Sequence, residues 1–159
     1  MVFSRALTAS SSACRLADGA QELAAHHAIR HQVFVVDQRL FVGNDRDDRD
    51  LHPDTLHAIG FDGDAIVGAV RLYPVYGYGL WQGDRLAVVP AARVRHLGAQ
   101  LVRFAVATAG ERGGQKMVAR IQLPNVRFFE HLGWHVDGEA ALYHGVMHQP
   151  MAIPLGQDP

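Results

Sequence analysis

A short basic segment between a predicted strand and a predicted helix carries the clearest chemical signal in the sequence. Arg93, Arg95 and His96 follow Pro90, and Gly98 begins a stretch with helical spacing. The first N–H groups of a helix have no partner inside it, and the helix dipole is positive at that end. The arginines add full charges, so this order of strand, basic loop and helix predicts an anion site for a phosphate-bearing ligand. The alternative is a surface loop whose arginines are merely solvated.

The elements around this segment follow from hydrophobic periodicity. Residues 86–89 are an apolar, branched run that predicts a buried strand, and Pro90 ends backbone donation there. Apolar residues recur at helical intervals from 98 to 110, where glycines end the helix. Neither of the common nucleotide-binding patterns, Gly-x-x-x-x-Gly-Lys-Ser/Thr or Gly-x-Gly-x-x-Gly, is present. The anion site is therefore of another kind.

The rest of the chain predicts further strands and helices. Strands are predicted at 13–17, 56–61, 65–72 and 116–123, helices at 20–36 and 125–132, and a closing hairpin at 140–147 and 148–155. Asp62-Gly63-Asp64, between two of these strands, is a strong hairpin signal. Residues 74–83, rich in tyrosine and glycine, are predicted to be a loop.

Two groups of residues could in principle bind a metal ion. His27 and His31 are spaced for one helix face, but no suitable third ligand lies nearby in the sequence, so a polar helix face is predicted. The charge-dense residues 44–54 lack the glycine and the distal glutamate of a helix–loop–helix calcium site. They are predicted to form a solvated, mobile loop. The other histidines show no zinc-like spacing, and no metal is predicted.

Composition limits the class of protein. The 159 residues predict a single domain, 1–159, with a sizeable core, and residues 1–12 are expected to be disordered. A formal net charge of -1 argues against a nucleic-acid binder, and no apolar run approaches membrane-spanning length. The single cysteine, Cys14, excludes an internal disulfide framework and favours a reducing cytoplasm. No export signal is expected at the start of the chain.

Three phrases of the sequence resemble the GCN5-related N-acetyltransferases (GNATs). Val88 to Leu101 is similar to their pyrophosphate loop, Arg/Gln-x-x-Gly-x-Gly/Ala after a strand ending in proline, with His96 in place of the first glycine. Asn125 to Trp134 resembles their second motif, Asn…Phe-Tyr-x-x-x-Gly-Phe, and Arg30 to Gln38 resembles their Arg-x-x-Val-Phe-Val-x-Glu-Gln run. The resemblance covers roughly residues 30–155. It implies an α/β (α+β) fold with a mixed, mostly antiparallel sheet flanked by helices, whose splayed central strands leave a cleft for a pantetheine arm.

Narrower likenesses point to two groups of relatives. The second motif is similar to that of bacterial acetyltransferases found with nitrogen-starvation gene clusters, which share Asn-Val-Arg-Phe-Phe-Glu…Leu-Gly-Trp. Gly68 to Pro74 and Trp81 to Val88 resemble the Gly-Cys-x-Arg-Leu-x-Pro and Trp-Glu-x-x-Arg-Phe-x-Val of acyl-homoserine-lactone synthases. The chain is shorter than those synthases usually are, so they come second. His148-x-x-Met151 resembles the Pro-His-x-x-Met of some superfamily members.

The GNAT resemblance implies transfer of an acetyl group from acetyl-CoA to a small-molecule amine by direct attack in a ternary complex. Such a transfer needs a neutral amine, a polarised carbonyl and a proton for the leaving thiolate. The residues implied to hold the cofactor are Ala87, Val88, Val89, Arg93, Val94, Arg95, His96, Leu97, Gly98, Ala99, Asn125, Phe128 and Phe129. Asn125 has an alternative role as a helix N-cap, and the two phenylalanines as packing residues.

The resemblance also implies catalytic roles for two side chains. Asp84, six residues before the strand-ending proline, stands where many relatives place a general base; the alternative is a plain salt bridge with Arg85. Phe129 replaces the tyrosine that donates a proton to the thiolate in relatives. Tyr143 is therefore a candidate acid, with Tyr73 or solvent as alternatives.

The acceptor is expected to be chosen by the variable segments 37–54 and 73–83. Homodimers are common among the relatives. Two other functions stay open: an acyltransferase that takes longer acyl chains or an amino-acid-derived acceptor, as the lactone synthases do, and a non-catalytic module that binds acyl-CoA. The missing tyrosine is the best argument for the second.

Overall fold

The computed structural model describes residues 13–75, 77–92 and 96–156. Its strands are β1 (Cys14–Leu16), β2 (Leu56–Asp62), β3 (Ala65–Pro74), β4 (Leu80–Val88), β5 (Lys116–Gln122), β6 (His135–Val136), β7 (Ala141–Tyr143) and β8 (Val146–Pro154). Its α-helices are α2 (Gly19–Arg30), α3 (Leu97–Glu111) and α4 (Val126–His131). A π-helix, η1 (His31–Asp37), continues α2, and two short 3-10 helices are η2 (Asp48–Leu51) and η3 (Leu123–Asn125).

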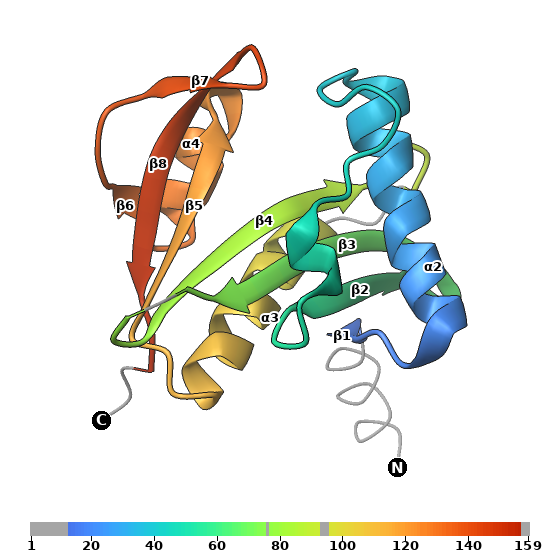
Figure 1. The fold of residues 1–159 in the computed structure, drawn as a ribbon, viewed down its shortest axis with the longest axis horizontal. Helices are drawn as coiled ribbons and strands as arrows, with labels where there is room; N and C mark the ends of the chain where they lie inside the picture. Colours follow the sequence, from blue (N-terminus) through green and yellow to red (C-terminus); the bar gives the residue numbers. More distant parts are fainter. Residues whose placement is uncertain (1–12, 76, 93–95, 157–159) are drawn as a thin grey trace.

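One sheet organises the described residues. Its strands run in the order β1-β2-β3-β4-β5-β8-β6, with β7 paired to β8 off this path. Neighbouring strands are antiparallel apart from β4 and β5, which are parallel. Helix α2 covers one face of the sheet and α3 the opposite face (Figure 1). The predicted fold class, a mixed and mostly antiparallel sheet flanked by helices, is confirmed.

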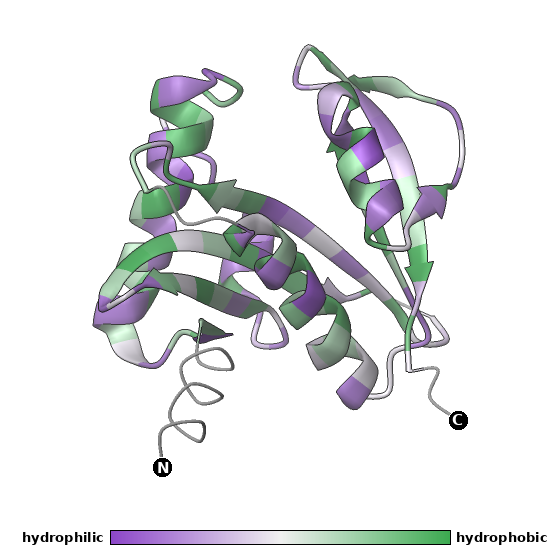
Figure 2. Cartoon of the chain, turned by 180° about the vertical axis from the view of Figure 1, so that it is seen from behind, coloured by the Kyte–Doolittle hydropathy of each residue, from purple (hydrophilic) through white to green (hydrophobic). Residues whose placement is uncertain are grey.

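Alternating side chains of the central strands supply two separate cores. Ala69 of β3 packs with Ile29, Val33 and Phe34 on the α2 side. Its neighbour Val70 belongs to a larger core on the α3 side. Successive side chains of a strand point to opposite faces, so one strand serves both cores. Figure 2 shows β4 with hydrophilic residues in its middle and hydrophobic ones near its ends.

Most predicted elements are confirmed to within a few residues, but the predicted loop at 74–83 was wrong at both ends. β3 continues to Pro74 and β4 begins at Leu80. Gly83 lies inside β4, where an added Cβ would come within 3.3 Å of the sulfur of Met117. Close packing with a neighbouring strand therefore overrides the low strand propensity of glycine.

The closing hairpin also differs from its prediction, which placed the turn between residues 147 and 148. The turn lies at His144 and Gly145, with φ of 51° and 79°. Two successive residues with positive φ form the two-residue turn whose twist matches that of antiparallel strands. β6 was not predicted, because two residues are too few to show a period.

The two central strands separate after a short pairing, as expected. β4 and β5 pair at Leu80↔Lys116, Trp81↔Met117 and Gln82↔Val118, although both strands continue beyond these residues. Figure 1 shows them diverging from a shared end. β4 also carries a bulge against β3, since Ala69 pairs with Ala87 but Arg71 with Asp84, and Arg85 between them has φ of 53°. Such an extra residue bends the strand that carries it, here just beyond the last residue of β4 that pairs with β5.

None of the helices among the described residues combines the length and the apolar character needed to cross a bilayer.

Candidate active site

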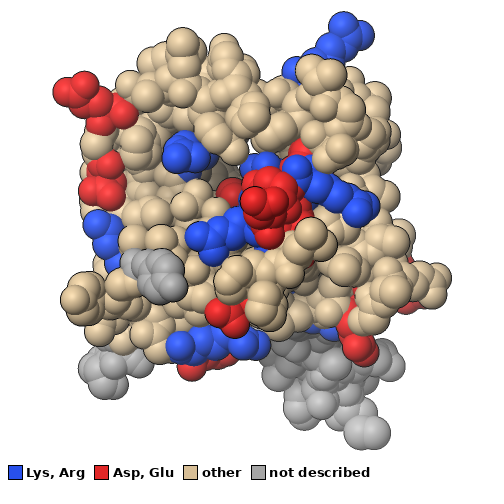
Figure 3. All heavy atoms as spheres, viewed as in Figure 1, with Lys and Arg blue, Asp and Glu red and all other residues tan. Residues whose placement is uncertain are grey.

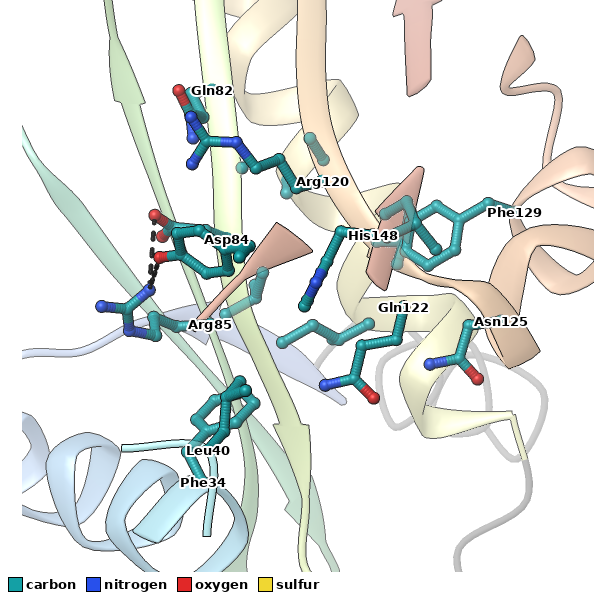
Figure 4. A pocket seen from close by; sticks show the side chains of 18 of the residues that line it. Phe34, Leu40, Gln82, Asp84, Arg85, Arg120, Gln122, Asn125, Phe129 and His148 are labelled. Atoms are coloured by element: carbon teal, nitrogen blue, oxygen red, sulfur yellow. Dashed lines mark hydrogen bonds and ion pairs between the residues drawn. The ribbon is translucent and has the colours of Figure 1, made fainter. Parts of the chain in front are cut away.

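A cleft opens where β4 and β5 separate. It holds about 940 Å³ of space between the atoms, part of it open to solvent. Residues 82–86 of β4 line one wall, and residues 119–122 of β5 with Tyr143 and His148 line the other. Figure 4 shows Gln82 and Asp84 on one wall and Arg120, Gln122 and His148 on the other.

The cleft is apolar toward α3, and its α2 side combines polar side chains with the apolar Phe34, Leu40 and Phe41. Val102, Ala105, Met117, Phe129 and Trp134 line it on the α3 side and belong to the larger core. Arg120 and Gln122 alternate with the core residue Ile121 along β5, so they project to the α2 side. His148 pairs with Gln122 across the sheet and shares its face.

A network of three buried arginines and four aspartates, of which Asp47 is exposed, supports the polar side. Arg30 pairs with Asp45 at 2.7 Å and Asp50 at 2.7 Å, Arg71 with Asp84 at 2.7 Å and Asp47 at 2.6 Å, and Arg85 with Asp45 at 3.2 Å and Asp47 at 3.3 Å. Figure 3 shows charged side chains of both signs gathered over this part of the face. A buried guanidinium is costly without an anion, so the arginines hold the acidic segment against the sheet.

Two predictions about this region were wrong in part. Most of residues 44–54 are exposed, as predicted for a solvated loop, but Asp45 is 2% exposed and η2 is capped by Asp47. Of the predicted polar helix face, His31 is exposed but His27 is buried, and the nearby His26 and Arg30 are buried too. The arginines interrupt apolar runs of the sequence, and this was the available signal that they might be buried and paired.

The network shifts several pKa values in directions set by burial and by ion pairing. Burial opposes ionisation of Asp50, but hydrogen bonds from His57 and Arg30 outweigh it and hold the pKa of Asp50 below its ordinary range. Burial lowers the pKa of His26 to about 3, and burial followed by the charge of Arg30 lowers the pKa of His27 to about 4. These two imidazoles are therefore neutral at pH 7.

One cluster has the composition of a metal site. Ligand atoms of His27, Asp50 and His57 lie within 4.8 Å of one another. However, Arg30 donates to both oxygens of Asp50, at 2.7 and 3.0 Å, so a cation would have to displace a buried ion pair. We therefore keep the prediction of no metal.

Asp84 lies in the cleft wall, and both of its oxygens are already engaged. Arg71 donates to each oxygen at 2.7 Å, and the hydroxyl of Tyr73 donates to one of them at 3.3 Å. A carboxylate has about four acceptor positions, so little capacity is left for a substrate proton. Asp84 does form a salt bridge, as in the alternative reading, but its main partner is Arg71, while Arg85 lies 3.9 Å away; its role as a base stays a prediction.

Tyr143 and His148 face each other in the cleft. The hydroxyl of Tyr143 accepts from Nη1 of Arg85 at 3.3 Å, and its ring packs edge-on to that of His148, with centroids 5.1 Å apart. Nδ1 of His148 lies 2.8 Å from the carbonyl oxygen of Val146, which assigns the proton to Nδ1 and leaves Nε2 as an acceptor. Nε2 has no hydrogen-bond partner among the described residues.

The other acid candidate, Tyr73, lies outside the cleft lining and donates to Asp84. Burial, followed by the charge of Asp84, raises its pKa to about 12. Tyr143 is therefore the better placed of the two. Sequence reasoning missed His148 as a site residue, although the His-x-x-Met likeness was a usable signal.

The predicted anion loop is described only in part. Arg93, Val94 and Arg95 lie outside the described residues. His96 is the N-cap of α3, with a left-handed φ of 68°, and Leu97 and Ala99 are buried. At Gly98 an added Cβ would meet only Cζ of Phe128, at 3.9 Å, so a ligand has room to approach the backbone there.

The remaining predicted cofactor residues lie at the end of β4 and around α4. Ala87 is buried, and Val88 and Val89 are half-buried. Asn125 occupies the N-cap position of α4 without a capping hydrogen bond and lines the cleft instead. Phe129 is buried against Trp134 and Phe128, whereas Phe128 is 38% exposed.

The chain is similar to one sequence family and to several solved structures. The family model for the acetyltransferase (GNAT) family matches residues 21–134. An acyl-CoA N-acyltransferase from Pseudomonas aeruginosa is 28% identical, with a TM-score of 0.74, covering 88% of this chain and 97% of that one. Escherichia coli ElaA is 23% identical, with a TM-score of 0.78 and coverages of 88% and 97%. BjaI, a CoA-dependent acyl-homoserine lactone synthase solved with SAM and isopentyl-CoA, is 22% identical, with a TM-score of 0.69 and coverages of 84% and 75%. No curated protein sequence matches the chain.

Proposed function

The chain belongs to the acetyltransferase (GNAT) family, and we propose that it transfers an acetyl group from acetyl-CoA to the amine of a small molecule. In this proposal the amine attacks the thioester directly while both substrates are bound. The observation that carries it is the short pairing of β4 with β5, which opens a cleft beside α3. The open strand edge suits a pantetheine arm, and the N-terminus of α3, which follows the end of β4 in the chain, suits a diphosphate.

Backbone groups are proposed to hold the cofactor and polarise its carbonyl. Residues 93–99 would bind the diphosphate, and Asn125 and Phe128 would contact the arm. Val89 donates its N–H to Val67 at 3.0 Å, and successive N–H groups of a strand point to opposite edges. The N–H of Val88 therefore points to the opposite edge of β4, which has no pairing with β5 there, and we propose that it stabilises the oxyanion that forms during transfer.

We assign the proton transfers to two side chains on the wall that contains β5, His148 and Tyr143. Nε2 of His148 accepts a proton from the attacking amine as the C–N bond forms. The C–S bond then breaks, and the thiolate takes a proton from the hydroxyl of Tyr143 or from solvent. Asp84 was the expected base, but its hydrogen bonds to Arg71 suit it better to holding the wall in place.

Release of free thiol from acetyl-CoA, measured across a panel of amines, tests this function. Turnover with at least one class of small amine is expected. Tight CoA binding without turnover on a broad panel would instead favour a non-catalytic acyl-CoA-binding module.

A second candidate is an acyltransferase of the acyl-homoserine-lactone-synthase type. The fold likeness to BjaI and the Trp81–Val88 phrase favour it. Comparing acetyl-CoA with longer acyl-CoA and acyl-carrier donors separates the two candidates, since a preference for the long donor would reject the first.

Several finer features remain predictions of the same proposal. They are a single domain, a cytoplasmic location, homodimer formation, and the narrower likeness to acetyltransferases of nitrogen-starvation gene clusters. Size-exclusion chromatography with light scattering tests the oligomeric state.

A further inference from the structure

The cleft wall holds one cation that no acidic side chain neutralises. The charged residues lining the cleft are Asp84, Arg85 and Arg120. Asp84 is paired with Arg71 at 2.7 Å, and Arg85 is paired with Asp45 at 3.2 Å. Arg120 forms no ion pair with any residue that the structure describes. Its charge is therefore available to a ligand.

Arg120 carries that charge on the α2 side of the cleft, where we place the acceptor amine. Arg120 projects from β5 to the polar side of the cleft, and its guanidinium extends toward Gln82 on the opposite wall (Figure 4). The guanidinium carbon lies 4.9 Å from the ring centroid of Tyr143, which supports it by a cation–π contact. A guanidinium offers N–H donors in a planar fork that matches a carboxylate.

From this geometry we infer that the acceptor is an amine that also carries a carboxylate, such as an amino acid, and that Arg120 binds the carboxylate. The inference rests on the proposed function and names its substrate class. The other polar groups on the α2 side of the cleft, Gln82 on one wall and Gln122 and His148 on the other, are suited to neutral hydrogen bonds and to the amine. Asp84 is occupied by Arg71, so the wall offers no free carboxylate for the second cation of a polyamine.

Pairs of acceptors that differ only in the carboxylate test whether Arg120 binds this group or is an ordinary solvated surface arginine. Each amino acid is compared with its carboxamide, which keeps the amine and removes the negative charge. Thiol release should show a higher kcat/KM for the amino acid than for the carboxamide. In Arg120→Gln the ratio of kcat/KM for the amino acid to kcat/KM for its carboxamide should fall roughly 10- to 100-fold. This is the usual effect of losing one charge-assisted hydrogen-bonded pair. Arg103→Gln, which removes an exposed arginine of α3 outside the cleft lining, is the matched control and should leave the ratio unchanged.

A binding measurement decides the inference even without turnover. Amino acids and their carboxamides are titrated calorimetrically into the protein in the presence of CoA. Tighter binding of the amino acid, lost in Arg120→Gln and kept in Arg103→Gln, supports the inference. Equal binding of both forms, or a preference that Arg120→Gln leaves intact, overturns it. Turnover of uncharged amines without any preference for a carboxylate would overturn this inference alone, whereas absence of turnover with every amine would reject the proposed function.

Discussion

Replacing Arg30 with methionine should strongly destabilise the fold, because Arg30 is fully buried between two carboxylates. It lies 2.7 Å from Asp45 and 2.7 Å from Asp50, with a side chain that is 0% exposed. Removing one partner of a buried ion pair costs about 3–5 kcal/mol. Asp45 keeps Arg85 and Asp50 keeps Arg71, so the lower half of that range is expected. At roughly 2–4 °C per kcal/mol for a domain of this size, Tm should fall by about 6–16 °C.

Thermal and urea unfolding followed by circular dichroism would measure this loss. The matched control is Arg15→Met, which removes an ion pair of similar length, 2.6 Å to Glu22, from a site where Arg15 is 47% exposed. Solvent and salt screen an exposed pair, so the control should change Tm little. Equal shifts in the two variants, or a negligible shift for Arg30→Met, would refute the reasoning that burial sets the strength of this network.

Three further perturbations test the site and the network. Gly98→Leu should weaken CoA binding by about tenfold or more, since it fills the space beside the helix start, whereas Asp84→Asn should mainly lower kcat; equal effects on CoA affinity would contradict these roles. His148→Ala should lower kcat by roughly 100-fold, with partial recovery in added imidazole, and no recovery would remove its role as base. Stability should fall as pH drops from about 6.5 toward 3, because burial lowers the pKa of His26 from 6.5 to about 3 and only the unfolded chain takes up the proton. Urea midpoints across this range should depend less on pH in His26→Asn, and an unchanged slope would count against the assignment.

The sequence predicted elements that have a clear period of their own. α3 was predictable because its apolar residues recur at helical spacing and glycines follow it. The start of β4 was not, because Gly83 has low strand propensity and its place is set by packing against Met117, a residue on another strand. The turn at His144 and Gly145 was missed because residues other than glycine seldom adopt positive φ, so His144 did not indicate a turn.

The candidate site also has a part that the sequence predicted and a part that it did not. The cofactor side was predictable from a contiguous motif, although Arg93, Val94 and Arg95 lie outside the described residues and their roles stay predictions. On the polar side, Asp84 and Tyr143 were predicted, but the pairing of the buried arginines with residues 45–50 was not, because those partners come from distant segments of the chain. Arg85 and Asp45, for example, are 40 positions apart and meet only once the sheet is formed. A charge-dense segment is solvated unless such distant partners exist, and local sequence does not reveal them.

Because β4 and β5 pair at only three residue pairs, the described part of the sheet consists of two halves joined at one end. β1 to β4 form one half and β5 to β8 the other, and in the strand order only this pairing connects them. Across the open end, Gln122 donates to Gln38 at 3.0 Å, and both side chains line the cleft. A ligand that enters there competes with this bridge. The larger core contains side chains of both halves, such as Leu72 of β3 and Met117 of β5, so packing as well as these three residue pairs holds the halves together beside the opening.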